Sequence, residues 1–211
     1  MQKTVQFQNV EAGRTIAFPI SREIRKESVR KAIHFLIALV PLLSNSIGAP
    51  TTLGLLAAGI LIYTYAEWKR SRGASVPFIS RITVYASRER DRGHFVLGPV
   101  TLGLGAMIAL MLYPEPAASL AIYALAFGDG VASLVGKIFG RTVLPASGGK
   151  TIEGSFACFA AVFAASFVVV GQVGVAIALA FTAALLEAAP TEDLDNLILP
   201  TGVGFLAILI V

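Results

Sequence analysis

The run AASLAIYALAFGDGVASLVG, residues 117–136, contains a single charged side chain, that of Asp129. About 20 predominantly apolar residues are needed to cross the hydrocarbon core of a bilayer. The run therefore predicts a transmembrane helix. An ionised side chain at membrane depth costs about 2.5–3.5 kcal/mol on insertion scales, so Asp129 needs a partner or a function.

The rest of the chain has the same character. Of 211 residues, 55% are hydrophobic and 14% are charged, with a mean hydropathy of +0.75. Globular proteins carry about 25% charged residues. We expect an all-α, polytopic membrane bundle of about seven transmembrane helices. The six further apolar runs cover residues 32–48, 51–66, 95–113, 155–171, 173–189 and 197–211.

Residues 1–31 are polar and basic, and they lack the apolar core of a signal peptide. We expect a cytosolic, partly interfacial segment over 1–31, followed by one transmembrane catalytic domain over 32–211. The only cysteine, Cys158, has no second cysteine with which to form an intrachain disulfide or a cysteine metal cluster.

The basic residues predict the orientation. Seven of the 17 Lys and Arg lie in 1–31, seven lie in 67–94, and the last three are Lys137, Arg141 and Lys150. With seven spans these segments share one side, whereas the opposite loops contain no Lys or Arg. The positive-inside rule then places the N-terminus in the cytosol. The longest loop, 67–94, has room for a short amphipathic helix.

The segment SGGKTIEGS, 147–155, ends like a P-loop, but Leu144 occupies the position of the first P-loop glycine and no strand precedes it. Its chemistry still suits phosphate, because Gly149 exposes backbone N–H groups, Lys150 is a cation and Thr151 has a hydroxyl. A helix that starts here would add its N-terminal dipole. The alternative is a cytosolic turn with a basic flank.

Three more clusters are predicted on the same side. Asp129, Ser133 and Lys137 follow at i, i+4 and i+8 and form one polar stripe, although small residues there also suit helix packing. Glu187, Asp195 and Asn196 supply oxygen ligands of the kind Mg²⁺ prefers, or simply an acidic loop with a helix cap. Arg30 and His34 share a helical face and could contact phosphate, or form an ordinary basic flank.

In order, these motifs resemble the polyprenol kinase family, which includes dolichol kinase, phytol kinase and the CTP-dependent diacylglycerol kinase. The resemblance covers about residues 26–202. It rests on R-K-x-x-H (30–34), G-D-G-x-A (128–132), G-K-x-x-G-R (136–141), G-K-T-x-E-G-S (149–155) and E…D-N-L-x-x-P (187–200). It implies transfer of the γ-phosphate of CTP, or another nucleoside triphosphate, to the hydroxyl of a membrane-dissolved lipid alcohol.

The same resemblance implies roles for individual residues. Asp129, Asp195 and Asn196 would hold Mg²⁺, and Glu153, Glu187 or His34 would accept the hydroxyl proton. The nucleotide would contact Arg30, Lys31, Gly128, Gly130, Ser133, Lys137, Gly149, Lys150, Thr151 and Gly154. One departure is Gly149, where family members often have a second basic residue.

Two alternatives stay open. A CDP-lipid synthase carries a similar G-D…K-T-x-E-G signature and also uses CTP and Mg²⁺, but releases pyrophosphate. A transporter would place ionisable residues at several membrane depths. The expected partners are a nucleoside triphosphate, a lipid alcohol and membrane lipids, with no nucleic acid.

Overall fold

The computed structural model describes residues 17–211 except 75, 88–90, 92 and 192–193. Over these residues the regular structure is helical, with one isolated antiparallel bridge between Val143 and Thr151. Within the predicted segment 1–31, residues 1–16 lie outside the described residues. The helices are α1 (Ala17–Leu36), η1 (Ile37–Leu39), α2 (Val40–Ile47), α3 (Ala49–Ser71), α4 (Pro77–Ala86), α5 (Gly98–Leu112), α6 (Ala117–Tyr123), η3 (Ala124–Asp129), α7 (Gly130–Phe139), α8 (Ile152–Val170), α9 (Val173–Ala188) and α10 (Asp195–Ile210).

The all-helical prediction is confirmed for the described residues, and each apolar run is helical over most of its length. Three helices are long and apolar enough to cross a membrane, namely Ala49–Ser71, Ala117–Phe139 and Ile152–Val170. Three more are apolar but shorter: α5, α9 and α10. The first run, 32–48, is divided among the end of α1, η1 and α2.

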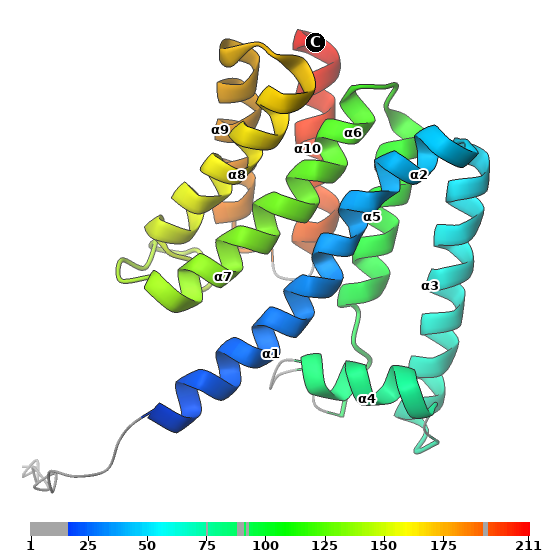
Figure 1. The fold of residues 1–211 in the computed structure, drawn as a ribbon. Helices are drawn as coiled ribbons and strands as arrows, with labels where there is room; N and C mark the ends of the chain where they lie inside the picture. Colours follow the sequence, from blue (N-terminus) through cyan, green and yellow to red (C-terminus); the bar gives the residue numbers. More distant parts are fainter. Residues whose placement is uncertain (1–16, 75, 88–90, 92, 192–193) are drawn as a thin grey trace, which may run out of the picture.

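The central helix is Ala117–Phe139, formed by α6, η3 and α7 without a break (Figure 1). Within its most apolar stretch 67% of the residues are buried, against 11% for α3 and 22% for α8, so the other helices surround it. α8 packs against α7 and α9, α10 packs against both α5 and α6, and α1 packs along α7. The segment η3 is π-helical, a local widening found often at functional sites.

The helices present two distinct ends. In Figure 1 the α3–α4, α7–α8 and α9–α10 connections lie at the lower end, and α4 lies across that end. The α2–α3, α5–α6 and α8–α9 connections and the C-terminus lie at the upper end. The basic connections expected to share one side therefore do lie at one end of the bundle. The helix α4 also lies within the long loop where a short helix was expected.

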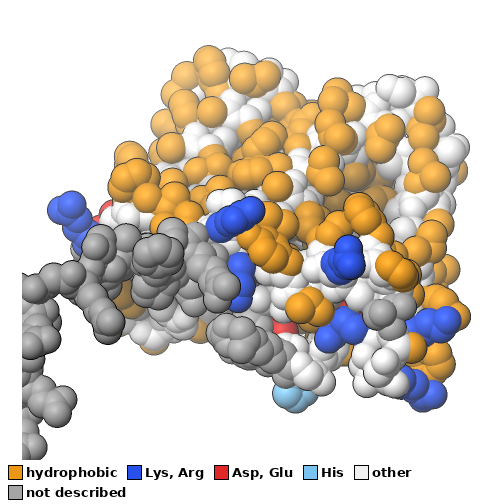
Figure 2. All heavy atoms as spheres, turned by 60° about the horizontal axis from the view of Figure 1, so that its bottom comes forward, with side chains coloured by type: hydrophobic (Ala, Val, Ile, Leu, Met, Phe, Trp, Pro, Cys, Tyr) orange, Lys and Arg blue, Asp and Glu red, His pale blue; other side chains and the backbone are white. Residues whose placement is uncertain are grey.

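The sides of the bundle are apolar. Leu61 of α3 is 68% exposed, Val168 of α8 is 84% exposed and Phe205 of α10 is 61% exposed. In Figure 2 hydrophobic side chains cover the sides, while Lys and Arg gather at the lower end, which is turned forward. Water penalises such an exterior, whereas the hydrocarbon core of a membrane accepts it.

Candidate active site

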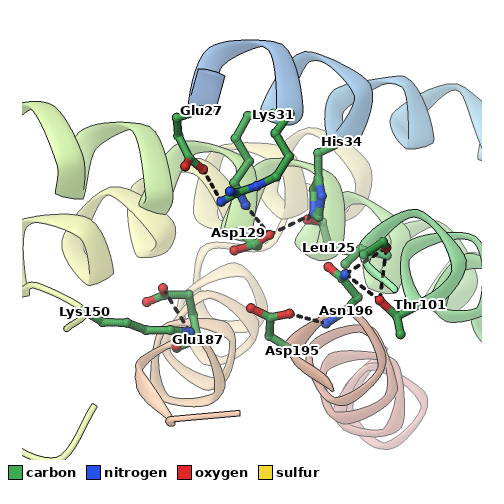
Figure 3. Close-up of polar contacts among 12 residues, drawn as sticks. Glu27, Lys31, His34, Thr101, Leu125, Asp129, Lys150, Glu187, Asp195 and Asn196 are labelled. Atoms are coloured by element: carbon green, nitrogen blue, oxygen red, sulfur yellow. Dashed lines mark hydrogen bonds and ion pairs between the residues drawn. The ribbon is translucent and has the colours of Figure 1, made fainter. Parts of the chain in front are cut away.

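Asp129 ends η3 and is paired with side chains of α1. Its Oδ2 lies 2.5 Å from Lys31 Nζ and 3.0 Å from His34 Nε2 (Figure 3). His34 Nε2 also lies 3.1 Å from the backbone oxygen of Leu125, and since both neighbours are acceptors, this nitrogen carries a hydrogen. Asp129, Lys31 and His34 are each at most 5% exposed. The acid in the central helix thus has the partners that its burial demands.

Glu27 makes a second charged contact between α1 and α7 and was not among the predicted site residues. Its Oε1 lies 2.5 Å from Arg30 Nη2, and its Oε2 lies 2.5 Å from Lys137 Nζ. It precedes Lys31 and His34 by four and seven residues, the spacing of one helical face. That spacing next to a predicted histidine is the sequence signal that could have found Glu27.

The segment 140–151 forms a turn that enters α8. Gly148 and Gly149 have φ angles of 70° and 97°, in the left-handed region that glycine adopts without a steric penalty. Thr151 is the N-cap of α8, and its hydroxyl oxygen accepts a hydrogen bond of 3.2 Å from Gly154 N. The expected helix start is confirmed. The Thr151 hydroxyl oxygen, which we predict to contact phosphate, also caps the N-terminus of α8.

Lys150 connects this turn to the end of α9. Its Nζ lies 3.4 Å from Glu187 Oε1 and also donates to the backbone oxygen of Glu187 (Figure 3). Glu187 Oε2 accepts a 3.2 Å hydrogen bond from Ser155 Oγ of α8. The predicted acid Glu187 is therefore fixed by a cation and a hydroxyl, and it is only 5% exposed.

Asp195 and Asn196 open α10, and Asn196 faces α5. Asn196 Nδ2 donates to Thr101 Oγ1 at 2.9 Å and to the Gly98 carbonyl at 3.4 Å, while Asp195 Oδ1 accepts from Asn196 N at 2.8 Å (Figure 3). Asn196 Oδ1 is buried and has no hydrogen-bond partner within the described part of the chain. The amide is thus held through its nitrogen, and its oxygen remains for a ligand.

Two cavities meet at these residues. The first, here called the polar cavity, has a volume of about 390 Å³ and lies between the segment 147–151, α7 and the α9–α10 connection. It gathers most of the predicted nucleotide-binding residues and three predicted acids. Those lining it are Arg30, Asp129, Ser133, Lys137, Gly149, Lys150, Thr151, Gly154, Glu187 and Asp195.

The second, here called the apolar-walled cavity, has a volume of about 210 Å³. α4 forms its apolar wall with Phe78, Ile79 and Ile82, and its polar end includes Lys31, His34 and Asn196. Arg30, Asp129 and Asp195 line both cavities. The two carboxylates predicted to hold Mg²⁺ thus stand where a polar compartment meets an apolar one.

Three predicted site residues line neither cavity. A Cβ on Gly128 would lie 3.0 Å from Val162 Cγ2, and a Cβ on Gly130 would lie 2.5 Å from Phe35 Cε1. Both glycines therefore serve close helix packing. Glu153 instead accepts the backbone N–H of Thr142 at 3.3 Å, in the first turn of α8.

Glu67 holds the loop that enters α5. It is 1% exposed, and its carboxylate accepts two hydrogen bonds from Arg70, at 2.6 and 2.7 Å, and one of 2.8 Å from Val96 N. Arg70 also donates to the His94 carbonyl at 2.6 Å. Because Val96 lines the apolar-walled cavity, this buried cluster fixes one side of that cavity.

The oxygens at the junction suit Mg²⁺. The described residues contain no cluster of three or more His, Cys, Asp or Glu that could hold a metal by themselves. Mg²⁺, however, usually takes one or two protein carboxylates and completes its shell with phosphate and water. Asp129, Asp195 and the unpartnered Oδ1 of Asn196 meet that requirement.

Comparison with known proteins adds no assignment. No protein-family model, curated protein or solved structure matches this chain.

Proposed function

We propose that this protein is a membrane-embedded lipid-alcohol kinase of the polyprenol kinase type, which uses CTP or another nucleoside triphosphate. The observation that carries the proposal is the junction of the two cavities. A phosphoryl donor and an apolar acceptor need compartments of opposite polarity that share their reacting end. Arg30, Asp129 and Asp195 line both compartments at that point.

The polar cavity takes the triphosphate in this proposal. Lys137 of α7 and Lys150 of the turn before α8 both line it, with Arg30 at the junction. Cations around a transferring phosphoryl group stabilise the charge that spreads over its oxygens. Mg²⁺ bound by Asp129, Asp195 and Asn196 would supply further neutralisation of the phosphate oxygens.

The apolar-walled cavity takes the head end of the lipid. Phe78 is 76% exposed on α4, so this wall is open to the surroundings of the protein as well as to the cavity. The volume of about 210 Å³ is below the roughly 300–1,000 Å³ of sites that enclose a whole small molecule. The hydroxyl and its first carbons would lie inside, and the remaining chain would stay in the bilayer.

The reaction then has a simple balance. The lipid oxygen bonds to the γ-phosphorus, the bond from that phosphorus to the β,γ-bridging oxygen breaks, and the nucleoside diphosphate leaves. The hydroxyl proton passes to a carboxylate or to water at the junction. Positioning and electrostatic stabilisation supply most of the rate enhancement in such transfers, which agrees with a site rich in fixed charges.

The proposal includes seven spans with a cytosolic N-terminus and the site on the cytosolic face. It is supported by the common end of the α3–α4, α7–α8 and α9–α10 connections. Single cysteines in 44–51 and in 67–74 test it, after the native Cys158, which is buried, is replaced by alanine. An impermeant thiol reagent added outside intact cells should label only the 44–51 position.

The activity test uses purified protein in lipid nanodiscs with Mg²⁺, labelled CTP or ATP, and a panel of prenols and diacylglycerol. A lipid monophosphate with the nucleoside diphosphate as co-product supports the kinase. A CDP-lipid with pyrophosphate, formed from a lipid phosphate, would identify a synthase instead. If no nucleotide is consumed with any acceptor, the proposal is wrong.

A further inference from the structure

Glu27 is buried while the two cations that it holds are not. Glu27 is 1% exposed at its side chain, whereas the side chains of Arg30 and Lys137 are 24% and 44% exposed. Each carboxylate oxygen contacts a different cation, at 2.5 Å in both cases. The carboxylate is therefore an internal anchor that presents two positive groups toward solvent-accessible space.

That space is the polar cavity, since Arg30 and Lys137 both line it. The two cations come from different helices, α1 and α7, and like charges this close repel each other unless an anion lies between them. The buried carboxylate of Glu27 supplies that anion. A ligand phosphate on the cavity side would meet a guanidinium and an ammonium whose spacing is already set.

A purely structural role for Glu27 would be redundant. α1 and the central helix are already joined by the buried Lys31–Asp129 pair and by the fit of Phe35 against Gly130. Burying a carboxylate costs several kcal/mol even when it is paired. The distinctive consequence of Glu27 is the fixed position of Arg30 and Lys137.

We propose that Glu27 is a positioning residue that fixes Arg30 and Lys137 as a pair for the transferring phosphoryl group. This inference rests on the proposed function. It also predicts an unusual kinetic signature. Replacing Glu27 by glutamine removes a negative charge beside the polar cavity, so nucleotide binding in the ground state does not weaken. The loss of alignment of Arg30 and Lys137 instead slows the chemical step, because a misplacement of about 1 Å can lower the rate around 100-fold.

The experiment measures kcat and both KM values in nanodiscs for wild type, Glu27→Gln and Glu27→Asp. We expect Glu27→Gln to lower kcat about 10- to 100-fold without raising the nucleotide KM, and Glu27→Asp to recover part of the loss because the charge returns. Glu115→Gln is the matched control, since Glu115 is bonded to Ser119 at 2.6 Å and lines neither cavity. Its kinetics should equal those of wild type.

A second variant covers the case in which Glu27→Gln does not fold. Glu27→Gln/Arg30→Gln/Lys137→Gln removes all three charges of this contact, and it should have the same kcat as Arg30→Gln/Lys137→Gln if Glu27 acts through these two cations. The inference is overturned by an unchanged kcat in folded Glu27→Gln, or by a triple variant much slower than Arg30→Gln/Lys137→Gln. Inactive wild type would instead refute the proposed function, so the two failures are distinguishable.

Discussion

Replacing Asp129 by asparagine keeps the size of the side chain and removes its charge. Lys31 would then be left 2% exposed with no anion at 2.5 Å. Removing one partner of a buried ion pair costs about 3–5 kcal/mol, because the other charge stays buried and uncompensated. We therefore expect Asp129→Asn to lose both lipid-kinase activity and about 3–5 kcal/mol of unfolding free energy.

The double variant Lys31→Met/Asp129→Asn separates the two losses. With both charges gone, an apolar side chain of similar length lies beside the amide, and exchanges of this kind are often neutral or stabilising. The double variant should recover most of the stability but none of the activity. Unfolding in mixed micelles of increasing SDS content measures the first quantity, and the nanodisc kinase assay measures the second.

Two results would refute this reasoning. If Asp129→Asn changes the unfolding free energy by less than about 1 kcal/mol, Lys31 and Asp129 do not form a buried pair. If the double variant transfers phosphate at the wild-type rate, Asp129 does not act at the junction.

Three further outcomes are expected. Lys150→Gln should raise the nucleotide KM about tenfold, the value of one charged contact of about 1.4 kcal/mol, with the lipid KM unchanged, measured by steady-state kinetics. Ile82→Trp should raise the lipid KM and leave the nucleotide KM unchanged, because Ile82 lines only the apolar-walled cavity. Val84 lies on the same helix and is 59% exposed, so Val84→Trp should change neither KM. Gly130→Ala should destabilise by about 1–3 kcal/mol in the SDS assay, since its Cβ would lie 2.5 Å from the Phe35 ring, while Gly174→Ala, with nothing within 4 Å, should not.

The helices could be predicted because apolar length is a property of consecutive residues. Each apolar run is helical over most of its length, and the start of α8 at Ile152 follows a glycine-rich turn, as expected. The widening of the central helix at η3 could not be predicted. The run 117–136 has the same hydropathy whether its turns are α-helical or π-helical.

Partners within the site were harder to predict, because they are far apart in the chain. Lys31 and Asp129 are 98 residues apart, and no pattern in the local sequence predicts that they are in contact. Lys137 was grouped with Asp129 by helical spacing. The structure instead pairs it with Glu27, although all members of the predicted stripe do line the polar cavity.

Glycines next to an acid have two interpretations for a physical reason. A missing side chain makes room for a ligand and for a neighbouring helix equally well, so Gly128 and Gly130 could be predicted only as places of close approach. In the structure, Val162 lies against Gly128 and Phe35 lies against Gly130. Glu27 could not be singled out because an acid in a basic helix is usually solvent-exposed, and its burial depends on α7.

The Lys31–Asp129 pair also has a consequence for biogenesis. When α1 leaves the ribosome, Lys31 lacks the acid with which it pairs in the folded protein, because Asp129 is 98 residues away in the chain. Burying either charge without its partner costs several kcal/mol. The docking of α1 on the central helix in its final arrangement therefore follows the synthesis of the central helix.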